Sequence, residues 1–177
     1  ERGIACVGID PTEALLAEAR RRDPDGRYQF GYAEELPFGD AEFDLVVSYL
    51  SLIDIRDAGR AISEMSRVLR PGGTLLIANL NSFITAASPD GWHECADGET
   101  RYCFDNYMDE RADWVSWRGI RIENWHRPLS TYMKLLLGQG LSLRWFDEPE
   151  PIGGDEARRT RYRRAPYFHV MEWRKGG

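Results

Sequence analysis

The chain has 177 residues, of which 42% are hydrophobic and 29% charged, and its net charge is −6. This composition is typical of one globular domain with its own core, and the negative charge argues against nucleic acid as the main partner. No apolar run approaches the ~20 residues that cross a bilayer, and no signal peptide is recognisable, so we expect no membrane partner. The three cysteines are an odd number without regular spacing, which favours a reducing cytoplasm over a disulfide framework.

The first part of the chain alternates short apolar runs with helical patterns. Residues 4–9 predict a strand that ends at Asp10, and a helix then begins with Thr12 as its expected N-cap. Further strands are predicted at residues 28–32, 43–49 and 75–78. Strands that alternate with helices through short loops indicate a parallel sheet with helices on both faces.

A second helix and a turn precede the last of these strands. Asp57 is the expected N-cap, and apolar residues recur with helical spacing from there to Leu69. Pro71, Gly72 and Gly73 are strong breakers, so we expect the helix to stop and the chain to turn before it enters a buried strand.

The pattern changes after Asn79. Residues 80–117 are predicted to be irregular, and residues 120–125 alternate like a strand. A helix is expected at residues 129–137 with Ser130 as a candidate cap. Two closing strands, at residues 141–146 and 167–173, are expected to pair antiparallel. The arginine-rich segment between them, residues 147–166, is predicted to be a polar loop that is solvated and mobile, although it could also hold an anionic substrate or RNA.

Ligands of an open parallel sheet bind beyond the carboxyl ends of its strands. Asp10 and the segments at residues 32–38 and 48–52 lie at such ends in the predicted fold. A carboxylate at Asp10 can accept two hydrogen bonds from a ribose diol, as a nucleoside cofactor requires. The alternative is that Asp10 only caps the helix that follows it.

Two segments resemble class I S-adenosylmethionine-dependent methyltransferases. Residues 67–79, with the Pro71-Gly72-Gly73 turn, resemble the segment that leads into the fifth strand of that family, and residues 31–38 resemble the loop after its third strand. The resemblance implies an α/β fold: a Rossmann-like, open, mostly parallel sheet with a C-terminal antiparallel strand pair. It also implies S-adenosylmethionine as the cofactor.

The resemblance assigns expected roles at the cofactor. Asp10 would hold the ribose, Ala33 would offer its backbone N–H to the adenine ring, and Tyr49 would lie beside the reactive methyl group. Tyr32 stands where the family commonly has an aspartate that accepts from the adenine amine, so it can serve there only through its hydroxyl or its ring. The cofactor-binding residues that we predict are Asp10, Pro11, Tyr32, Ala33, Glu34, Ser48, Tyr49 and Leu50.

One family element has no counterpart in the sequence. The glycine-rich loop after the family's first strand would precede Glu1, so the first strand and this loop are absent. We therefore expect a single methyltransferase domain over residues 1–177 that is partial at its N-terminus, or a chain that binds the cofactor poorly. The acceptor-side lid of the family corresponds to an insertion at about residues 80–127.

The acceptor side is predicted around residues 125–132. His126 is the candidate general base, because an imidazole can accept a proton near neutral pH, and Tyr49 is the second candidate catalytic residue. Trp125, Arg127 and Tyr132 are the candidate substrate contacts, with Arg127 as an anion anchor. The alternative for His126 is a structural hydrogen bond to a loop or a helix start.

Other clusters carry weaker signals. Four tryptophans lie between residues 92 and 125, where aromatic walls would suit a planar acceptor, although a small satellite core explains them equally well. His93, Cys95 and Cys103 have irregular spacing and no evident fourth ligand, so we expect no metal site.

The resulting hypothesis is an enzyme that transfers a methyl group from S-adenosylmethionine to a small molecule by in-line displacement. One rival is a non-catalytic binding or scaffold domain of the same fold. A second is a nicotinamide-dependent oxidoreductase, which Asp10 alone would suit, and a third is a nucleic-acid methyltransferase. The sequence leaves the acceptor, its attacking atom and the oligomeric state open.

Overall fold

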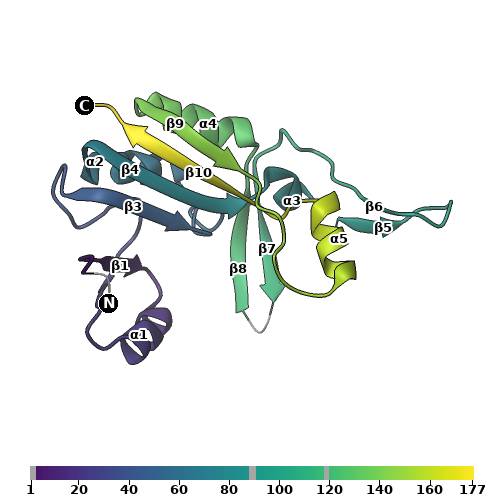
Figure 1. The fold of residues 1–177 in the computed structure, drawn as a ribbon, viewed down its shortest axis with the longest axis horizontal. Coiled ribbons are helices and arrows are strands. Elements are labelled where there is room, and N and C mark those ends of the chain that lie inside the picture. The colour runs from purple at the N-terminus through teal and green to yellow at the C-terminus, as the bar shows by residue number, and fades with distance from the viewer. Residues whose placement is uncertain (1–2, 88–90, 118–119) are drawn as a thin grey trace.

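A computed structural model describes residues 3–87, 91–117 and 120–177 (Figure 1). The N-terminal strands β1 (Val7–Asp10) and β2 (Arg27–Phe30) form a separate parallel pair, and helix α1 (Glu13–Arg22) connects them. Both strands are shorter than predicted. Thr12 does occupy the N-cap position of α1, but its side chain forms no capping bond; instead its backbone N–H donates to Asp10 Oδ1 at 2.8 Å.

The main sheet has four strands in the order β3-β4-β10-β9. Strands β3 (Phe43–Tyr49) and β4 (Leu69–Leu80) are parallel, whereas β10 (Phe168–Lys175) runs antiparallel to both β4 and β9 (Leu141–Asp147). The predicted α/β class and the closing antiparallel pair are therefore confirmed, and the sheet is mixed.

Helices α2 (Ala58–Val68) and α4 (Leu129–Gly138) cover one face of this sheet. Asp57 caps α2 as predicted, because its carboxylate accepts from Arg60 N at 2.9 Å. Ser130 is not the cap of α4, which begins at Leu129 after Pro128. The helices and strands share one apolar core, which includes Ile62, Met65, Leu75, Ile77, Tyr132, Leu136, Met171 and Trp173.

The turn predicted at residues 71–73 lies inside strand β4. Helix α2 ends at Val68 and the strand begins at once at Leu69, while the register along β3 jumps from Phe43↔Leu69 to Leu45↔Thr74. The extra residues of β4 form an irregularity that Gly72, at φ +72°, makes possible. The helix thus stops as expected, but a strand bulge replaces the free turn.

Residues 80–127 contain more regular structure than predicted. Helix α3 (Ser82–Ala86) follows β4, β5 (Trp92–Glu94) pairs with β6 (Thr100–Tyr102), and β7 (Arg111–Trp117) pairs with β8 (Ile120–His126). The expectation of irregular chain over residues 80–117 was wrong, and the strand expected at residues 120–125 is confirmed. Figure 1 shows the long β7–β8 hairpin beside α3, with the β5–β6 hairpin extending away from the main sheet.

Helix α5 (Glu156–Arg164) lies where the sequence predicted a loop. Asp155 caps it by accepting from Arg158 N at 2.8 Å, and Glu156 pairs with Arg159 one turn along. None of its residues is buried, so it lacks the apolar stripe on which a helix prediction rests.

Candidate active site

Asp10 is the last residue of β1, Tyr32 comes two residues after the end of β2, and both lie at the same edge of that strand pair. Gly31 N donates to Asp10 O at 3.3 Å, which holds the two strand ends together. The Asp10 carboxylate is half-buried and accepts from Thr12 at Oδ1, whereas Oδ2 accepts no hydrogen bond within the described part of the chain. The Tyr32 ring is 55% exposed. One carboxylate oxygen and one aromatic ring are therefore open to a ligand here.

The loop after Tyr32 is held by helix α2. Arg60 Nε donates to Glu34 O at 2.7 Å, and Glu64 Oε2 accepts from Leu36 N at 2.9 Å. Arg67 pairs with Glu64 and lowers the pKa of that carboxyl group. Ala33 packs against the main core. The loop is thus fixed, as backbone contacts with a cofactor require.

The end of β3 supplies the next group of predicted residues. Ser48 is buried and shares a 2.7 Å hydrogen bond with the Ser51 hydroxyl, while the Tyr49 ring is 72% exposed. Leu50 adopts φ +52°, which is uncommon for a residue with a branched side chain, and its N–H donates to Ala78 O at 2.8 Å. Such backbone strain at a strand end is common at ligand sites.

Asp54 connects this edge to the β7–β8 hairpin. Although much of the residue is exposed, partial desolvation raises the pKa of Asp54 to about 6, and the charge of Asp10 adds to the rise while the Asn124 hydrogen bond opposes it. Trp125 N also donates to Ile53 O at 2.6 Å. These contacts bring β8 toward the side on which the cofactor residues were predicted.

The residues present fit a nucleoside cofactor in part. The free oxygen of Asp10 suits a ribose hydroxyl, and the exposed rings of Tyr32 and Tyr49 suit flat or apolar groups. Within the described ranges, no glycine-rich loop follows a strand at this edge, so the partners of the remaining cofactor atoms are not among these residues.

Arg127 is buried and holds the backbone together. Its guanidinium donates to the carbonyl oxygens of Leu52, Ile55 and Arg56 at 2.6–3.2 Å, and it stacks 5.0 Å from the centre of the Trp125 ring. These bonds use three of its five N–H donors, and its Nε lies 3.9 Å from Glu110 Oε2. Its role as an anion anchor stays a prediction.

Tyr132 also lies in the core, not at the surface of a cleft. Its side chain is 2% exposed and its hydroxyl has no hydrogen-bond partner within the described residues. Burial raises the pKa of Tyr132, and the nearby cation of Arg127 opposes the rise. Its predicted substrate contact stays a prediction as well.

His126 is buried with both ring nitrogens in hydrogen bonds. Nε2 lies 2.9 Å from Tyr107 O, which can only accept, so Nε2 carries the proton and Nδ1 accepts from the Thr85 hydroxyl at 2.8 Å. Burial is the main cause that lowers the pKa of His126, so the ring is neutral at pH 7. The same Thr85 hydroxyl lies 3.1 Å from Ser82 O, which offers it a second acceptor.

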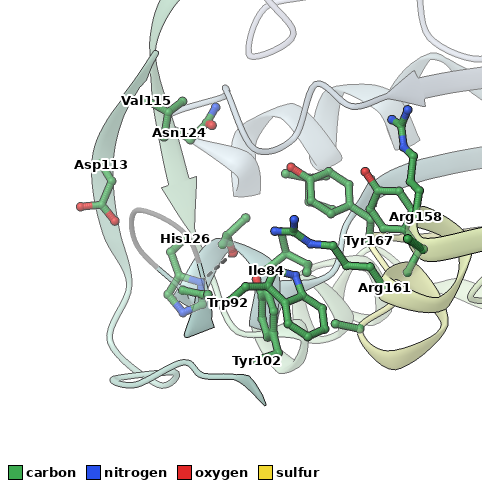
Figure 2. A pocket seen from close by; sticks show the side chains of 17 residues that line it. Ile84, Trp92, Tyr102, Asp113, Val115, Asn124, His126, Arg158, Arg161 and Tyr167 are labelled. Carbon is green, nitrogen blue, oxygen red and sulfur yellow. Dashed lines mark hydrogen bonds between the residues drawn. The ribbon is translucent and has the colours of Figure 1, made fainter. Parts of the chain in front are cut away.

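His126 and Thr85 line a cavity of about 760 Å³ between β8, α3 and α5 (Figure 2). Trp92, Tyr102, Arg158 and Arg161 also line it. The sequence analysis offered aromatic walls as one explanation of the tryptophan cluster. It placed the arginines on a mobile loop, whereas in the structure they belong to helix α5. A helix that buries no residue gives no periodic signal, and only the Asp155–Glu156 start could have indicated it.

Over the described ranges, no cluster of three or more His, Cys, Asp or Glu side chains is arranged to hold a metal ion. None of the helices described there combines the length and apolar character needed to span a bilayer.

Sequence comparisons identify related proteins. The sequence model of a family described as "Methyltransferase domain" matches residues 1–77. A demethylmenaquinone methyltransferase of Beutenbergia cavernae is 39% identical over 80 residues, which cover 45% of this chain and 33% of the relative. A malonyl-[acyl-carrier protein] O-methyltransferase of Serratia marcescens is 33% identical over 99 residues, which cover 56% of this chain and 38% of the relative. The matched segment thus spans between a third and two fifths of the length of these relatives.

Solved structures match over nearly the whole chain. An S-adenosylmethionine-dependent methyltransferase from Mesorhizobium loti superposes with a TM-score of 0.83 at 25% identity and covers 96% of this chain and 80% of its own. A putative S-adenosylmethionine-dependent methyltransferase from Listeria monocytogenes gives a TM-score of 0.85 at 23% identity, with coverage of 97% and 79%. The hairpins and helix α5 therefore lie within the matched fold.

Proposed function

We propose that this protein, whose chain belongs to the class I S-adenosylmethionine-dependent methyltransferases, transfers a methyl group from S-adenosylmethionine to a small-molecule acceptor. The observation that carries the proposal is the open carboxylate oxygen of Asp10 at the end of β1, beside the fixed loop that begins at Tyr32. The relative named for demethylmenaquinone supports an acceptor of small-molecule type. The three free cysteines, Cys6, Cys95 and Cys103, support a cytoplasmic location.

The residues at the strand ends would bind and orient the cofactor. S-adenosylmethionine, when bound, supplies a sulfonium methyl group that is already activated for in-line displacement. Asp10 would accept from the ribose, Tyr32 and Ala33 would flank the adenine, and Ser48 and Tyr49 would lie beside the methionine end. Alignment and exclusion of water are then the main tasks of the protein. The remaining contacts predicted around these residues are Pro11, Glu34 and Leu50.

His126 would serve the acceptor through Thr85. The neutral Nδ1 accepts from the Thr85 hydroxyl, and Thr85 itself lines the cavity. An acceptor hydroxyl could pass its proton to Thr85 Oγ1 while Thr85 passes its own proton to Nδ1. After this transfer His126 Nδ1 carries a proton and donates it back to Thr85 Oγ1, so the hydrogen bond between the two side chains is kept with its direction reversed.

The cofactor assignment is tested by calorimetric titration of the protein with S-adenosylhomocysteine. We expect Asp10→Ala to weaken binding by roughly 1.5–3 kcal/mol, because a hydrogen bond to a charged group is lost. Asp10→Asn keeps a side-chain oxygen that can accept from Thr12 N, so it controls for any effect of losing that bond on the start of α1. Asp25→Ala removes an exposed carboxylate elsewhere and should leave the affinity unchanged.

The outcomes separate the rival functions. If the wild-type protein binds and Asp10→Ala binds equally well while folded, the assignment of Asp10 is wrong. If the folded wild-type protein does not bind at all, a non-catalytic domain of the same fold becomes the better reading, and Tyr32 is the first residue to examine.

A further inference from the structure

The hydroxyl of Thr85 faces the cavity as a hydrogen-bond acceptor. Thr85 lines the cavity, and its Oγ1 lies 2.8 Å from His126 Nδ1 and 3.1 Å from Ser82 O. Both of these groups accept, so they share the single proton of the hydroxyl. Within the part of the chain that the structure describes, no group donates to Thr85 Oγ1. The lone pairs of this oxygen are therefore left for a ligand that carries an O–H or N–H group.

The walls around this hydroxyl are largely apolar. Leu80, Ile84 and Val115 contribute aliphatic side chains, and Trp92 and Tyr102 contribute aromatic rings (Figure 2). The two rings pack edge to face, with their centres 5.2 Å apart. A polar acceptor atom surrounded by such walls suits an apolar molecule with one hydrogen-bond donor, and the volume of about 760 Å³ suits a small ligand.

The charged side chains that line the cavity are screened or already paired. Arg158 and Arg161 belong to helix α5 and are exposed, so water weakens their attraction for a charged ligand. The carboxylate of Asp113 accepts from Arg111 Nε at 3.1 Å. These residues therefore do not require a charged ligand at the Thr85 end of the cavity.

The cavity extends toward the edge at which the cofactor residues were predicted. Asn124 lines it and donates its amide hydrogen to Asp54. The carboxyl group of Asp54 in turn lies close enough to Asp10 to respond to its charge. A ligand in the cavity would thus lie on the side of Asn124 that is nearer to the transferred methyl group.

The weakness of His126 as a base selects among donors. Burial lowers its pKa below the ordinary value of about 6.5. A phenol, with a pKa near 10, can pass a proton to such a base far more readily than an aliphatic alcohol, which is about as weak an acid as water, with a pKa near 15.7. An amine attacks through a lone pair that is already free and needs no base before the attack.

We propose that this cavity binds the methyl acceptor as a phenol whose hydroxyl donates to Thr85 Oγ1. The aromatic body of the phenol would lie among Leu80, Ile84 and Val115, with the rings of Trp92 and Tyr102 beside it. This inference rests on the proposed function in one respect, which is that the bound phenol is the acceptor.

The proposed transfer leaves every proton with a partner. The phenol oxygen forms a bond to the methyl carbon while the bond between that carbon and sulfur breaks, and its electron pair stays on sulfur. The phenol proton passes to Thr85 Oγ1, and the former Thr85 proton passes to His126 Nδ1. Thr85 then donates its new proton to Ser82 O, which explains why a second acceptor lies 3.1 Å away. The two N–H groups of His126 donate to Thr85 Oγ1 and to Tyr107 O.

The test is equilibrium dialysis without cofactor, with two phenols and their methyl ethers as probes: 2-naphthol, 4-butylphenol, 2-methoxynaphthalene and 4-butylanisole. At least one phenol should bind roughly fivefold more tightly than its ether, because an ether has no proton to donate to Thr85. Dialysis of 2-naphthoate in parallel tests an anion of the same shape, which we expect to bind more weakly than 2-naphthol.

Substitutions at Thr85 locate this preference. Thr85→Val keeps the shape of the side chain but removes the hydroxyl, so the ratio of phenol to ether affinity should fall to about one. Thr85→Ser keeps the hydroxyl and should keep most of the preference. Thr74→Val is the matched control, because Thr74 is half-buried on β4, accepts from Arg174 at 3.0 Å and does not line the cavity.

Four results would overturn the proposal: no binding of either phenol by the folded protein, equal binding of phenols and ethers, a preference that survives Thr85→Val, or tighter binding of 2-naphthoate than of 2-naphthol. Each is separate from the titration with S-adenosylhomocysteine. A preference that depends on Thr85 in a protein that does not bind S-adenosylhomocysteine would leave the phenol site standing and reject the methyltransferase function.

Discussion

His169 is a buried titratable residue whose tautomer is set by its neighbours. Asn81 donates its amide hydrogens to Pro166 O and Phe168 O, so its Oδ1 must accept from His169 Nδ1, at 3.1 Å. His169 Nε2 is then a buried acceptor without a partner among the described residues. A second proton on this nitrogen would find no acceptor there, which agrees with burial lowering the pKa of His169 to about 4.

This low pKa predicts a pH dependence of stability. Between pH 6.5 and about 4 the unfolded chain protonates this histidine and the folded chain does not, so stability falls as the pH falls through that window, by roughly 3 kcal/mol in all. Urea unfolding of the wild type and of His169→Gln at several pH values checks this. The part of the decrease in unfolding free energy that His169 causes should be missing in His169→Gln. The stability difference between the wild type and the variant should therefore change across this pH window.

The comparison also separates His169 from Asp54. The raised pKa of Asp54 acts with the opposite sign, because the folded state then binds the extra proton, but Asp54 is present in both proteins and cancels in the difference. His93→Gln, at an exposed position, serves as a control. If the wild type and His169→Gln lose stability in parallel, His169 does not titrate as a buried group.

The positions of the candidate site residues at strand ends could be predicted from the sequence, but the hydrogen bonds of these residues could not. Asp10, Tyr32 and Ser48 are at strand ends as expected, because apolar runs mark where a strand stops. The sequence also indicated His126 and Arg127 as candidates for chemistry, yet their partners lie 19 to 75 residues away: the Thr85 hydroxyl and the Tyr107 carbonyl for His126, and the Leu52 carbonyl for Arg127. Such long-range contacts leave no local pattern.

At the scale of elements, helices α2 and α5 both begin with a capping aspartate but differ in burial. Helix α2 was predicted from its apolar stripe and packs into the core, whereas α5 was missed because it buries none of its residues. The same local signal, a carboxylate that accepts from the N–H three residues ahead, is present in both. Packing against the sheet distinguishes them.

This contrast predicts different responses to loss of the cap. Asp57→Ala should lower the global free energy of unfolding by about 1 kcal/mol, because α2 unfolds only with the core. Asp155→Ala should leave global stability almost unchanged and accelerate amide hydrogen exchange within α5 by roughly fivefold. Urea unfolding and exchange monitored by mass spectrometry measure the two effects. An equal global loss in both variants would show that α5 folds together with the core.

At the scale of the whole molecule, the main sheet has one covered face and one open edge. Helices α2 and α4 cover one face, while Leu45, Val47 and Tyr49 project from β3 on the other and are 50–72% exposed. Within the described ranges, β3 pairs with β4 alone, so its outer backbone edge is unpaired. The fold class was predictable because strand–helix alternation is local, but the separation of the β1–β2 pair from the main sheet was not.

An open edge with exposed apolar side chains predicts self-association of this chain. Unpaired N–H and C=O groups beside apolar side chains favour pairing with another copy, and a lysine at the edge opposes it. We expect the hydrodynamic radius of the wild-type protein, measured by dynamic light scattering, to increase with concentration, and we expect Val47→Lys to reduce this increase. Leu137→Lys is the matched control, because Leu137 is equally exposed, at 55%, but lies on helix α4 and not on β3. If both substitutions reduce association equally, the change in net charge is responsible and the β3 edge is not the contact; if only Val47→Lys acts, association proceeds through β3.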